Sequence, residues 1–169
     1  DRLYVGTNFG FSVVDPVTGL IENFNNRYDL QPTSIYGYTE CFVDDTVHKA
    51  LWIGTGYGLA RMSKTEGDTL QLLRPANPVD QVHMPGFILC MVQDPQNPGI
   101  LWLGAKEGLF RYEIDTDQYT YFSCKDIPAD EKLIWDIFID NNGVIWHSIG
   151  SGYVVGYHPD NQQWTVHRI

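Results

Sequence analysis

One short phrase recurs four times along the chain, and this repetition constrains the fold more than any other feature. It reads LYVGTNFGFSVV at 3–14, LWIGTGYGLARM at 51–62, LWLGAKEGLFRY at 101–112 and IWHSIGSGYVVG at 145–156. Each version places a glycine six residues after an aromatic residue, in the pairs Tyr4/Gly10, Trp52/Gly58, Trp102/Gly108 and Trp146/Gly152. Self-similarity at intervals of 44–50 residues is typical of repeat architectures.

The third copy shows what one repeat contains. Its apolar segment 86–92 suits a strand that is buried on both faces, and a turn rich in Asp, Asn and Pro follows it. We expect a second strand at 100–104, a third at 109–114 and a half-exposed fourth at 118–122. Gly108 lies in the tight connection between the second and third strands, where it can adopt a positive φ. Each repeat is therefore a four-stranded meander.

Four short strands per repeat, graded from apolar to amphipathic, are typical of one blade of a β-propeller. We expect strands at 38–43, 50–55, 59–63 and 69–73 in copy two, and at 133–139, 144–148, 153–157 and 164–167 in copy four. Copy one begins inside its second strand, Arg2–Gly6. The sequence thus predicts an all-β propeller with fifteen strands in about four antiparallel blades, the first of which lacks its inner strand. The longest helical candidate, Pro128–Lys132, could form one turn.

The four repeats span about 1–33, 34–82, 83–129 and 130–169. Only Arg168 and Ile169 follow the last predicted strand, too few residues to supply the inner strand that copy one lacks. We therefore expect an arc of a larger propeller of about six to eight blades. The alternative is a four-bladed ring that tolerates one three-stranded blade. Each end of this arc should leave one apolar face uncovered, including around Tyr4 and Trp146, because no blade follows to cover it.

The recurring aromatic and glycine residues have an architectural explanation. Trp52 and Trp102 fall in second strands, where a large side chain can fill the space between blades. Gly54 and Gly104 permit close backbone approach at the end of the same strand. Cys41 and Cys90 occupy equivalent positions on adjacent inner strands, and Asp136 stands there in copy four. We expect both thiols to be buried and reduced, because equivalent positions in adjacent blades are commonly too far apart for a disulfide.

The composition narrows the possible partners. The formal net charge of −10 argues against nucleic acid and against an anionic membrane surface as partners. The apolar runs are too short to cross a bilayer. The three cysteines form neither a disulfide framework nor a CxxC motif.

The pattern LW[IL]G[TA]xxGLxR at 51–61 and 101–111, together with the DPVTG turn at 15–19, resembles a known repeat. It is similar to the two-component-regulator propeller repeat of the sensor regions of bacterial hybrid histidine kinases. Copy four departs from it, with His147 for an aliphatic residue and Ser148 for the glycine, and it resembles the propellers of streptogramin lyase instead. The resemblance implies a sensor module outside the cytoplasm, in the periplasm, that binds a ligand which is often glycan-derived.

The chain contains no phosphate-binding loop, nucleophile elbow or HExxH motif. We expect no catalytic residue, cofactor or metal in it. His147, His158 and His167 lie on successive strands of copy four and could approach one another, but scattered histidines are the simpler interpretation. The aspartates gather in turns, where carboxylates accept backbone hydrogen bonds.

Candidate ligand-binding residues come from two places. Glu40, Leu89 and Trp135 align on the innermost strand, and a charge at Glu40 needs solvent or a partner, such as the water of a central channel. The long connections 25–33, 74–85 and 123–132 lead from the fourth strand of one blade to the next, and long loops on a rigid scaffold often carry function. The predicted site comprises Tyr38, Glu40, Arg74, Asp80, His83, Phe87 and Trp135.

The sequence therefore favours a non-catalytic ligand-sensing module whose ligand is an oligosaccharide or another small molecule. Its other expected partner is the remainder of a larger propeller or sensor protein. Two alternatives stay open: a propeller portion of a carbohydrate-active enzyme or lyase, and a protein-interaction scaffold.

Overall fold

The computed structural model describes residues 2–25, 38–65, 70–73, 84–128 and 130–169, and all helices and strands assigned in them are β-strands. These form four antiparallel sheets. Sheet 1 contains β1 (Leu3–Thr7), β2 (Gly10–Val14) and β3 (Ile21–Asn25), and sheet 2 contains β4 (Thr39–Asp45), β5 (Ala50–Thr55), β6 (Gly58–Ser63) and β7 (Leu70–Leu72). Sheet 3 contains β8 (Ile88–Gln93), β9 (Ile100–Ala105), β10 (Gly108–Glu113) and β11 (Gln118–Phe122), and sheet 4 contains β12 (Ile134–Ile139), β13 (Ile145–Ile149), β14 (Tyr153–His158) and β15 (Gln163–Arg168).

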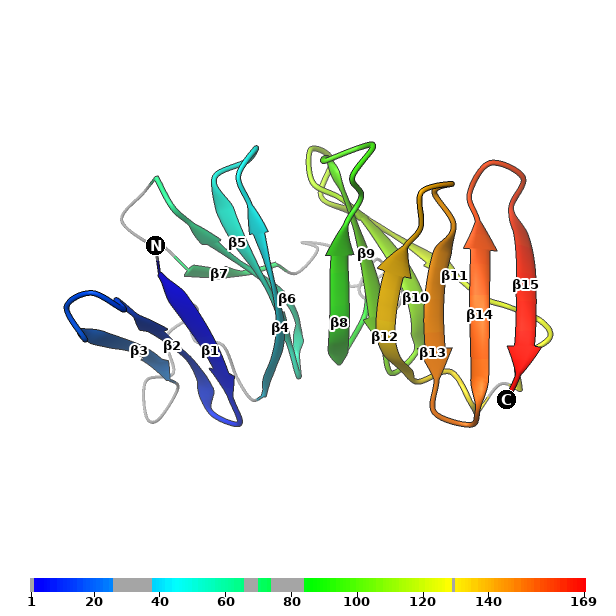
Figure 1. The fold of residues 1–169 in the computed structure, drawn as a ribbon, viewed down its shortest axis with the longest axis horizontal. Helices are drawn as coiled ribbons and strands as arrows, with labels where there is room; N and C mark the ends of the chain where they lie inside the picture. Colours follow the sequence, from blue (N-terminus) through cyan, green and yellow to red (C-terminus); the bar gives the residue numbers. More distant parts are fainter. Residues whose placement is uncertain (1, 26–37, 66–69, 74–83, 129) are drawn as a thin grey trace.

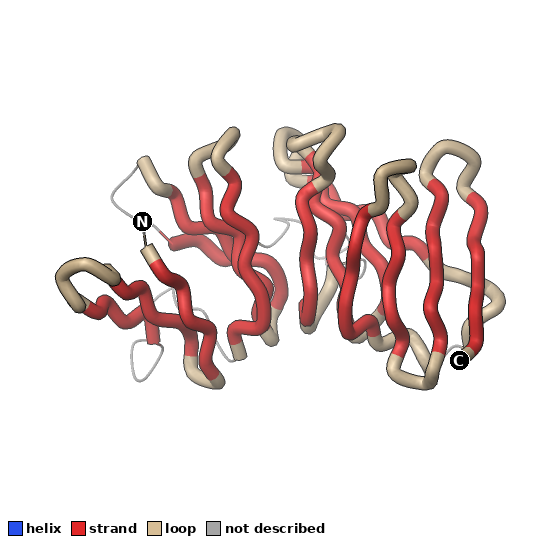
Figure 2. The backbone as a smooth tube through the Cα atoms, viewed as in Figure 1, coloured by secondary structure: helices blue, strands red, loops and turns tan. Residues whose placement is uncertain are grey.

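The sheets follow one another as an open arc. In each sheet the strands pair in chain order, and the first strands β4, β8 and β12 contact one another in succession. Sheets 1 and 4 lie at opposite ends of the molecule (Figures 1 and 2). The four sheets therefore form an open arc, as the strand count predicted, and do not close into a small ring.

The predicted strands are confirmed to within two residues at each end. The three-stranded sheet 1 lacks the inner strand, as expected from the start of copy one. The inner strands β4 and β8 begin at Thr39 and Ile88, one and two residues later than predicted, because their pairing with β5 and β9 starts there. Residue 69, predicted to open the fourth strand of copy two, lies outside the described residues.

A shared turn joins the first two strands of sheets 2, 3 and 4. One aspartate in each turn, Asp45, Asp94 or Asp140, accepts two backbone N–H bonds through Oδ1. Its Oδ2 accepts the indole N–H of the repeated tryptophan, over 3.0 Å from Trp52, 3.4 Å from Trp102 and 2.9 Å from Trp146. The aspartate thus ties the turn to the second strand, and its role is structural.

The joint between two sheets explains the recurring glycines. A Cβ at Gly104 would collide with Cys90 Sγ in the same sheet and lie 2.6 Å from Ile134 Cγ2 of sheet 4. At the equivalent joint between sheets 2 and 3, a Cβ at Gly54 would collide with Cys41 Sγ and lie 2.9 Å from Ile88 Cγ2. The next sheet packs into the space that a side chain would occupy. Gly108, in the adjoining hairpin, has the predicted positive φ of 130°.

The repeated aromatic residue fills the rest of each joint. Trp102 is only 2% exposed, and its ring lies 5.3 Å from that of Phe122 and 5.9 Å from that of Tyr157 in sheet 4. Trp52 contacts Tyr112 of sheet 3 in the same way, at 5.5 Å between ring centroids. Each tryptophan therefore faces the following sheet.

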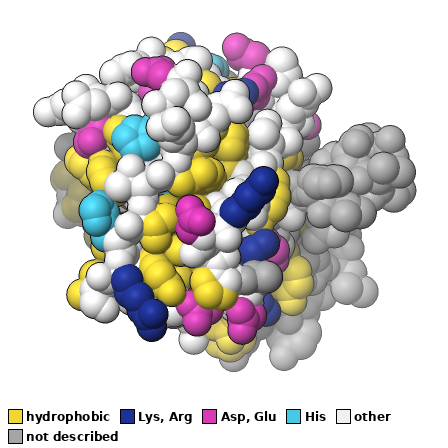
Figure 3. Space-filling model, turned by 90° about the vertical axis from the view of Figure 1, so that its right-hand side faces the viewer, with side chains coloured by type: hydrophobic (Ala, Val, Ile, Leu, Met, Phe, Trp, Pro, Cys, Tyr) yellow, Lys and Arg dark blue, Asp and Glu magenta, His cyan; other side chains and the backbone are white. Residues whose placement is uncertain are grey.

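The uncovered faces of the end sheets differ from the prediction at one point. Tyr4 packs against Phe42 of sheet 2, so it lies on the covered face of sheet 1, and Leu3 and Val5 form the exposed face instead. The repeated aromatic residue points toward the following sheet. In copy one this residue is Tyr4, and sheet 2 therefore covers it. In sheet 4 the face beyond Trp146 is open, and hydrophobic side chains appear on it among charged ones (Figure 3).

Both inner-strand cysteines are free, as predicted. Cys90 is buried, but Cys41 is half-buried, so the expectation of full burial holds for one of them. Desolvation raises the pKa of each thiol to about 12. Both thiols are therefore protonated and unreactive at neutral pH.

Candidate functional site

The inner strands share an irregularity that the sequence alignment did not reveal. The register shifts between Thr39 and Cys41 in β4, and it shifts at the equivalent places in β8 and β12. The unpaired residues at these bulges are Glu40, Leu89 and Trp135, the three positions that the repeat aligns. A bulge re-aims a side chain that would otherwise follow the strand alternation.

The bulges leave two of these side chains open to solvent. Glu40 is exposed, which accounts for a charge on an inner strand, and Trp135 is 57% exposed. The Trp135 indole packs beside Gly150, where a Cβ would lie 2.5 Å from its Nε1. Leu89, between them, is half-buried.

Tyr38 and Phe87 come together across the joint of sheets 2 and 3. Their ring centroids are 6.2 Å apart, and Tyr38 is 48% exposed. The backbone of each residue is held by a hairpin of its own sheet. The Tyr38 carbonyl oxygen accepts the N–H of Gly56 over 2.9 Å, and the Phe87 carbonyl oxygen accepts the N–H of Lys106 over 3.0 Å. We call Tyr38, Glu40, Phe87 and Trp135, at the starts of the three inner strands, the inner rim.

The structure thus brings together part of the predicted site. Tyr38 and Phe87 are neighbours, whereas Glu40 and Trp135 stand on β4 and β12 with β8 between them. Arg74, Asp80 and His83 lie outside the described residues.

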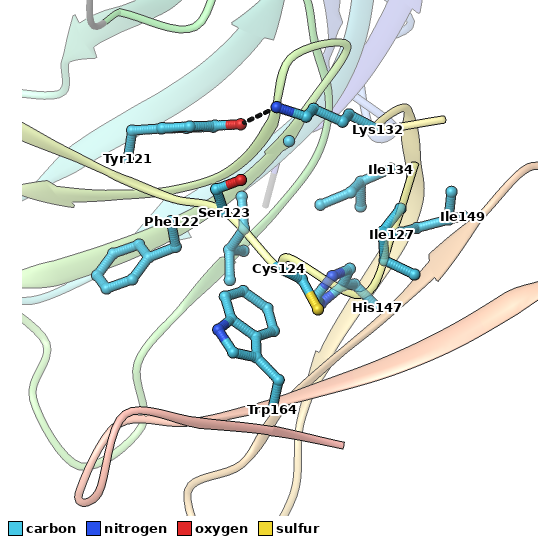
Figure 4. Close-up of a pocket in the computed structure, with 12 residues that line it drawn as sticks. Tyr121, Phe122, Ser123, Cys124, Ile127, Lys132, Ile134, His147, Ile149 and Trp164 are labelled. Carbon is cyan, nitrogen blue, oxygen red and sulfur yellow. Dashed lines mark hydrogen bonds between the residues drawn. The ribbon is translucent and has the colours of Figure 1, made fainter. Parts of the chain in front are cut away.

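A second feature, a small cavity between sheets 3 and 4, was not predicted. Its volume is about 20 Å³, room for one water molecule (Figure 4). Its polar lining includes Ser123, Cys124, Lys132 and His147. Lys132 donates to the Tyr121 hydroxyl over 3.0 Å. Ser123, Cys124 and Lys132 lie in the long connection 123–132, and Tyr121 lies just before it. The length of this connection was the one sign in the sequence of a site here. His147 comes from β13, which the connection does not indicate.

His147 is the unusual group in this cavity. The residue is buried, and its Nδ1 has no hydrogen-bond partner within the described part of the chain. Desolvation lowers its pKa to about 4, so the imidazole is neutral at physiological pH. It occupies the position held by Leu103 and Ile53 in the preceding copies.

The three histidines of copy four do not gather. His147 faces sheet 3, whereas His167 stacks on Trp146 of the opposite face, at 6.3 Å between ring centroids. His158 instead lies 2.9 Å from the Thr165 hydroxyl. Among the residues that the structure describes, no three His, Cys, Asp or Glu side chains form a metal-binding group, and no helix is long and apolar enough to cross a membrane.

Comparison with known proteins supports the fold. No protein-family model and no curated protein matches the chain. Solved structures do match, among them the extracellular domains of two Bacteroides thetaiotaomicron proteins described as hybrid two component systems. The first is 19% identical, with a TM-score of 0.72, over 96% of this chain and 19% of its own length. The second is 17% identical, with a TM-score of 0.73, over 97% of this chain and 21% of its own length.

Two further matches have other descriptions. An auxiliary nutrient binding protein from the same organism is 12% identical, with a TM-score of 0.64, over 99% of this chain and 38% of its own. The WD40 β-propeller domain of Doa1 is 10% identical, with a TM-score of 0.67, over 99% of this chain and 50% of its own. These likenesses establish the propeller fold that the repeat predicted. The chain spans about a fifth of the length of the sensor domains that it matches.

Proposed function

We propose that this chain is part of an extracytoplasmic β-propeller that senses a ligand for a two-component-type system. The observation that carries this proposal is the match of its four-sheet arc, over 96% of its length, to an extracellular domain of a protein described as a hybrid two component system. The quoted repeat, which resembles that of such sensors, points the same way.

The ligand is a glycan-derived or other small extracellular molecule, and it binds at the inner rim. Half-exposed aromatic rings such as Tyr38 and Phe87 offer apolar faces on which a sugar ring can stack. The Glu40 carboxylate supplies an acceptor for hydroxyl groups, and Trp135 a further exposed ring. Backbone hydrogen bonds at Tyr38 and Phe87 hold this surface in place, so little conformational entropy is lost on binding. The proposed site also includes Arg74, Asp80 and His83, which precede β8 in the sequence.

The partner of the chain is the remainder of a larger propeller. The uncovered faces of sheets 1 and 4 support this, because exposed apolar sheet surface in a soluble protein commonly marks a contact. We infer a non-catalytic role. Among the carboxylates, Asp45, Asp94 and Asp140 support it, because they are engaged in turns and indole contacts.

Saturation-transfer NMR against a panel of neutral and acidic oligosaccharides tests the proposal. We expect at least one ligand to bind, and the double variant Tyr38→Ala/Phe87→Ala to weaken its binding about tenfold or more, the loss of one or two stacked rings. Val47→Ala, in the exposed turn at the other end of β4, is the control and should bind normally. An unchanged affinity in the double variant would exclude the inner rim, and silence across the panel would exclude a glycan ligand.

A further inference from the structure

A groove of about 460 Å³ opens on the outer side of the joint between sheets 3 and 4. Its lining consists of Trp102, Arg111, Thr120, Tyr121, Phe122, Ser123, Tyr157, Pro159, Gln162 and Trp164. Its volume lies in the range of small-molecule sites, roughly 300–1,000 Å³. It adjoins the small cavity, because Tyr121, Phe122, Ser123 and Trp164 line both spaces. Figure 4 shows these four side chains around the small cavity. None of these residues belongs to the inner rim.

The floor of the groove is a rigid aromatic cluster. Tyr157 is buried, and its ring centroid lies 4.7 Å from that of Phe122 in sheet 3 and 4.7 Å from that of Trp164 on β15. Phe122 and Trp164 are only half-buried, so part of each ring can meet a ligand. Packed rings of this kind provide a preorganised platform for the apolar face of another ring.

Arg111 is the one charged side chain in the lining. Its Nη2 donates to Glu113 in an ion pair, and its Nε is buried with no acceptor among the described residues. Arg61, at the equivalent position in sheet 2, lies over the Trp52 ring at 5.7 Å. The Nε of Arg61 is likewise buried with no acceptor among the described residues. Arg111 is about a third exposed beside the groove, and its guanidinium keeps N–H donors that the ion pair with Glu113 does not use. The planar fork of a guanidinium can pair with a carboxylate through two N–H groups.

The edge of the groove is polar and uncharged. Thr120, Ser123 and Gln162 are exposed there and offer two hydroxyl groups and one amide. These groups can donate to and accept from ligand hydroxyls. The groove therefore suits a ligand with an apolar ring face, a negatively charged group and several hydroxyl groups.

We propose that this groove binds a sugar acid, a pyranose ring that carries a carboxylate. The ring lies on Phe122 and Trp164, the carboxylate pairs with Arg111, and the ring hydroxyls contact Thr120, Ser123 and Gln162. This site is independent of the proposed function at the inner rim, and either can fail without the other.

Glucuronate and glucose are the probes, because they differ only in the carboxylate at C6. In a titration followed by ¹H–¹⁵N NMR, glucuronate should shift the Trp164 indole and Arg111 side-chain signals. The affinity for glucose should be lower by about tenfold or more, because glucose lacks one charge-assisted contact. Raising the salt concentration should weaken glucuronate binding alone, because the Arg111 contact is partly exposed to solvent.

Two variants and two controls complete the test. Arg111→Gln should abolish the preference for glucuronate, and Trp164→Leu should weaken both sugars. Arg168→Gln makes the same charge change outside the groove, and Tyr38→Ala alters the inner rim; both should leave glucuronate binding unchanged. If Arg111→Gln does not fold, Arg111→Lys, which keeps the charge but not the fork, should show a reduced preference. Equal binding of the two sugars, a preference retained in Arg111→Gln, or loss of binding in Tyr38→Ala would overturn the proposal.

Discussion

The joint between sheets 3 and 4 and the open face of sheet 4 use the same strand positions in different ways. At the joint, Trp102 is almost completely buried, and Gly104 leaves room for Ile134 of the next sheet. At the open face, Trp146 is half-buried and Ser148 replaces the glycine.

The inner strands show the same contrast. Cys90 and Val92 of β8 correspond to Asp136 and Phe138 of β12. Cys90 is buried, whereas Asp136 is exposed and Phe138 is 64% exposed. Sheet 4 nevertheless keeps the strand order and the aspartate–tryptophan turn of the other sheets. Contact between sheets therefore requires the small and apolar residues of the repeat. The turn and the hairpin are needed to form each sheet, whether or not another sheet covers it.

The largest effect should come from the aromatic residue of the joint. Trp102→Ala should lower the free energy of unfolding by about 3–5 kcal/mol, the usual loss for a buried large aromatic side chain. Trp146→Ala, at the same position on the open face, should cost about 1–2 kcal/mol, since it is only partly removed from water. Denaturant midpoints of both variants measure this. Equal losses would mean that the two faces are covered alike.

The buried His147 adds a pH dependence to the same joint. Its pKa is about 4 in the folded chain and 6.5 as a free side chain, so the folded state favours the neutral form. The stability that it contributes is complete above pH 6.5 and is lost as the pH falls toward 4. The loss approaches about 3 kcal/mol at full protonation.

His147→Leu, which restores the residue type of the preceding copy, isolates this effect. Unfolding measured in denaturant at several values between pH 7 and pH 4 should show a steeper loss of stability in the natural chain than in the variant. Parallel pH profiles would show that His147 is hydrated in the folded state.

The glycine of the joint should give an intermediate effect. Gly104→Ala inserts a methyl group against Cys90 and Ile134, and overpacking of this kind costs about 1–3 kcal/mol. Ser148→Ala, at the matching position of sheet 4, should change stability by less than about 0.5 kcal/mol. Thermal unfolding of the pair checks this, and a tolerated alanine at position 104 would show that the joint is loosely packed.

The smallest effect is expected next to the joint rather than in it. Lys106 lies exposed in the hairpin that follows Gly104, and Lys106→Ala should change stability by less than about 0.5 kcal/mol. A loss comparable to that of Trp102→Ala, measured under the same conditions, would mean that the strand register is wrong.

Sequence reasoning succeeded where the repeat supplied internal comparison. The strands, the missing inner strand, the open arc and the role of Trp102 all follow from four aligned copies with a two-residue alternation. The packing of Tyr4 against sheet 2 was missed, although the alignment contained the answer: Tyr4 is equivalent to Trp52, which faces the following sheet.

Features that depend on contacts across the repeats could not be predicted. The bulges at Glu40 and Trp135 arise from the pairing of two strands, and no residue type marks them. The groove combines Arg111 of β10 with Gln162, which follows β14, and the cavity combines Cys124 with His147. A single copy shows only half of each such site, so the repeat pattern conceals them.

Thiol labelling tests most directly the claim that the repeat encodes covered joints and that sheet 4 presents an uncovered one. Asp136→Cys places a thiol at the position that Cys90 occupies in sheet 3. Labelling in the native protein, read by mass spectrometry of the separate peptides, compares the two thiols in one molecule. The account predicts rapid modification at position 136 and modification of Cys90 only on unfolding. Equally slow labelling at both positions would show that the face of sheet 4 is covered and would contradict the account.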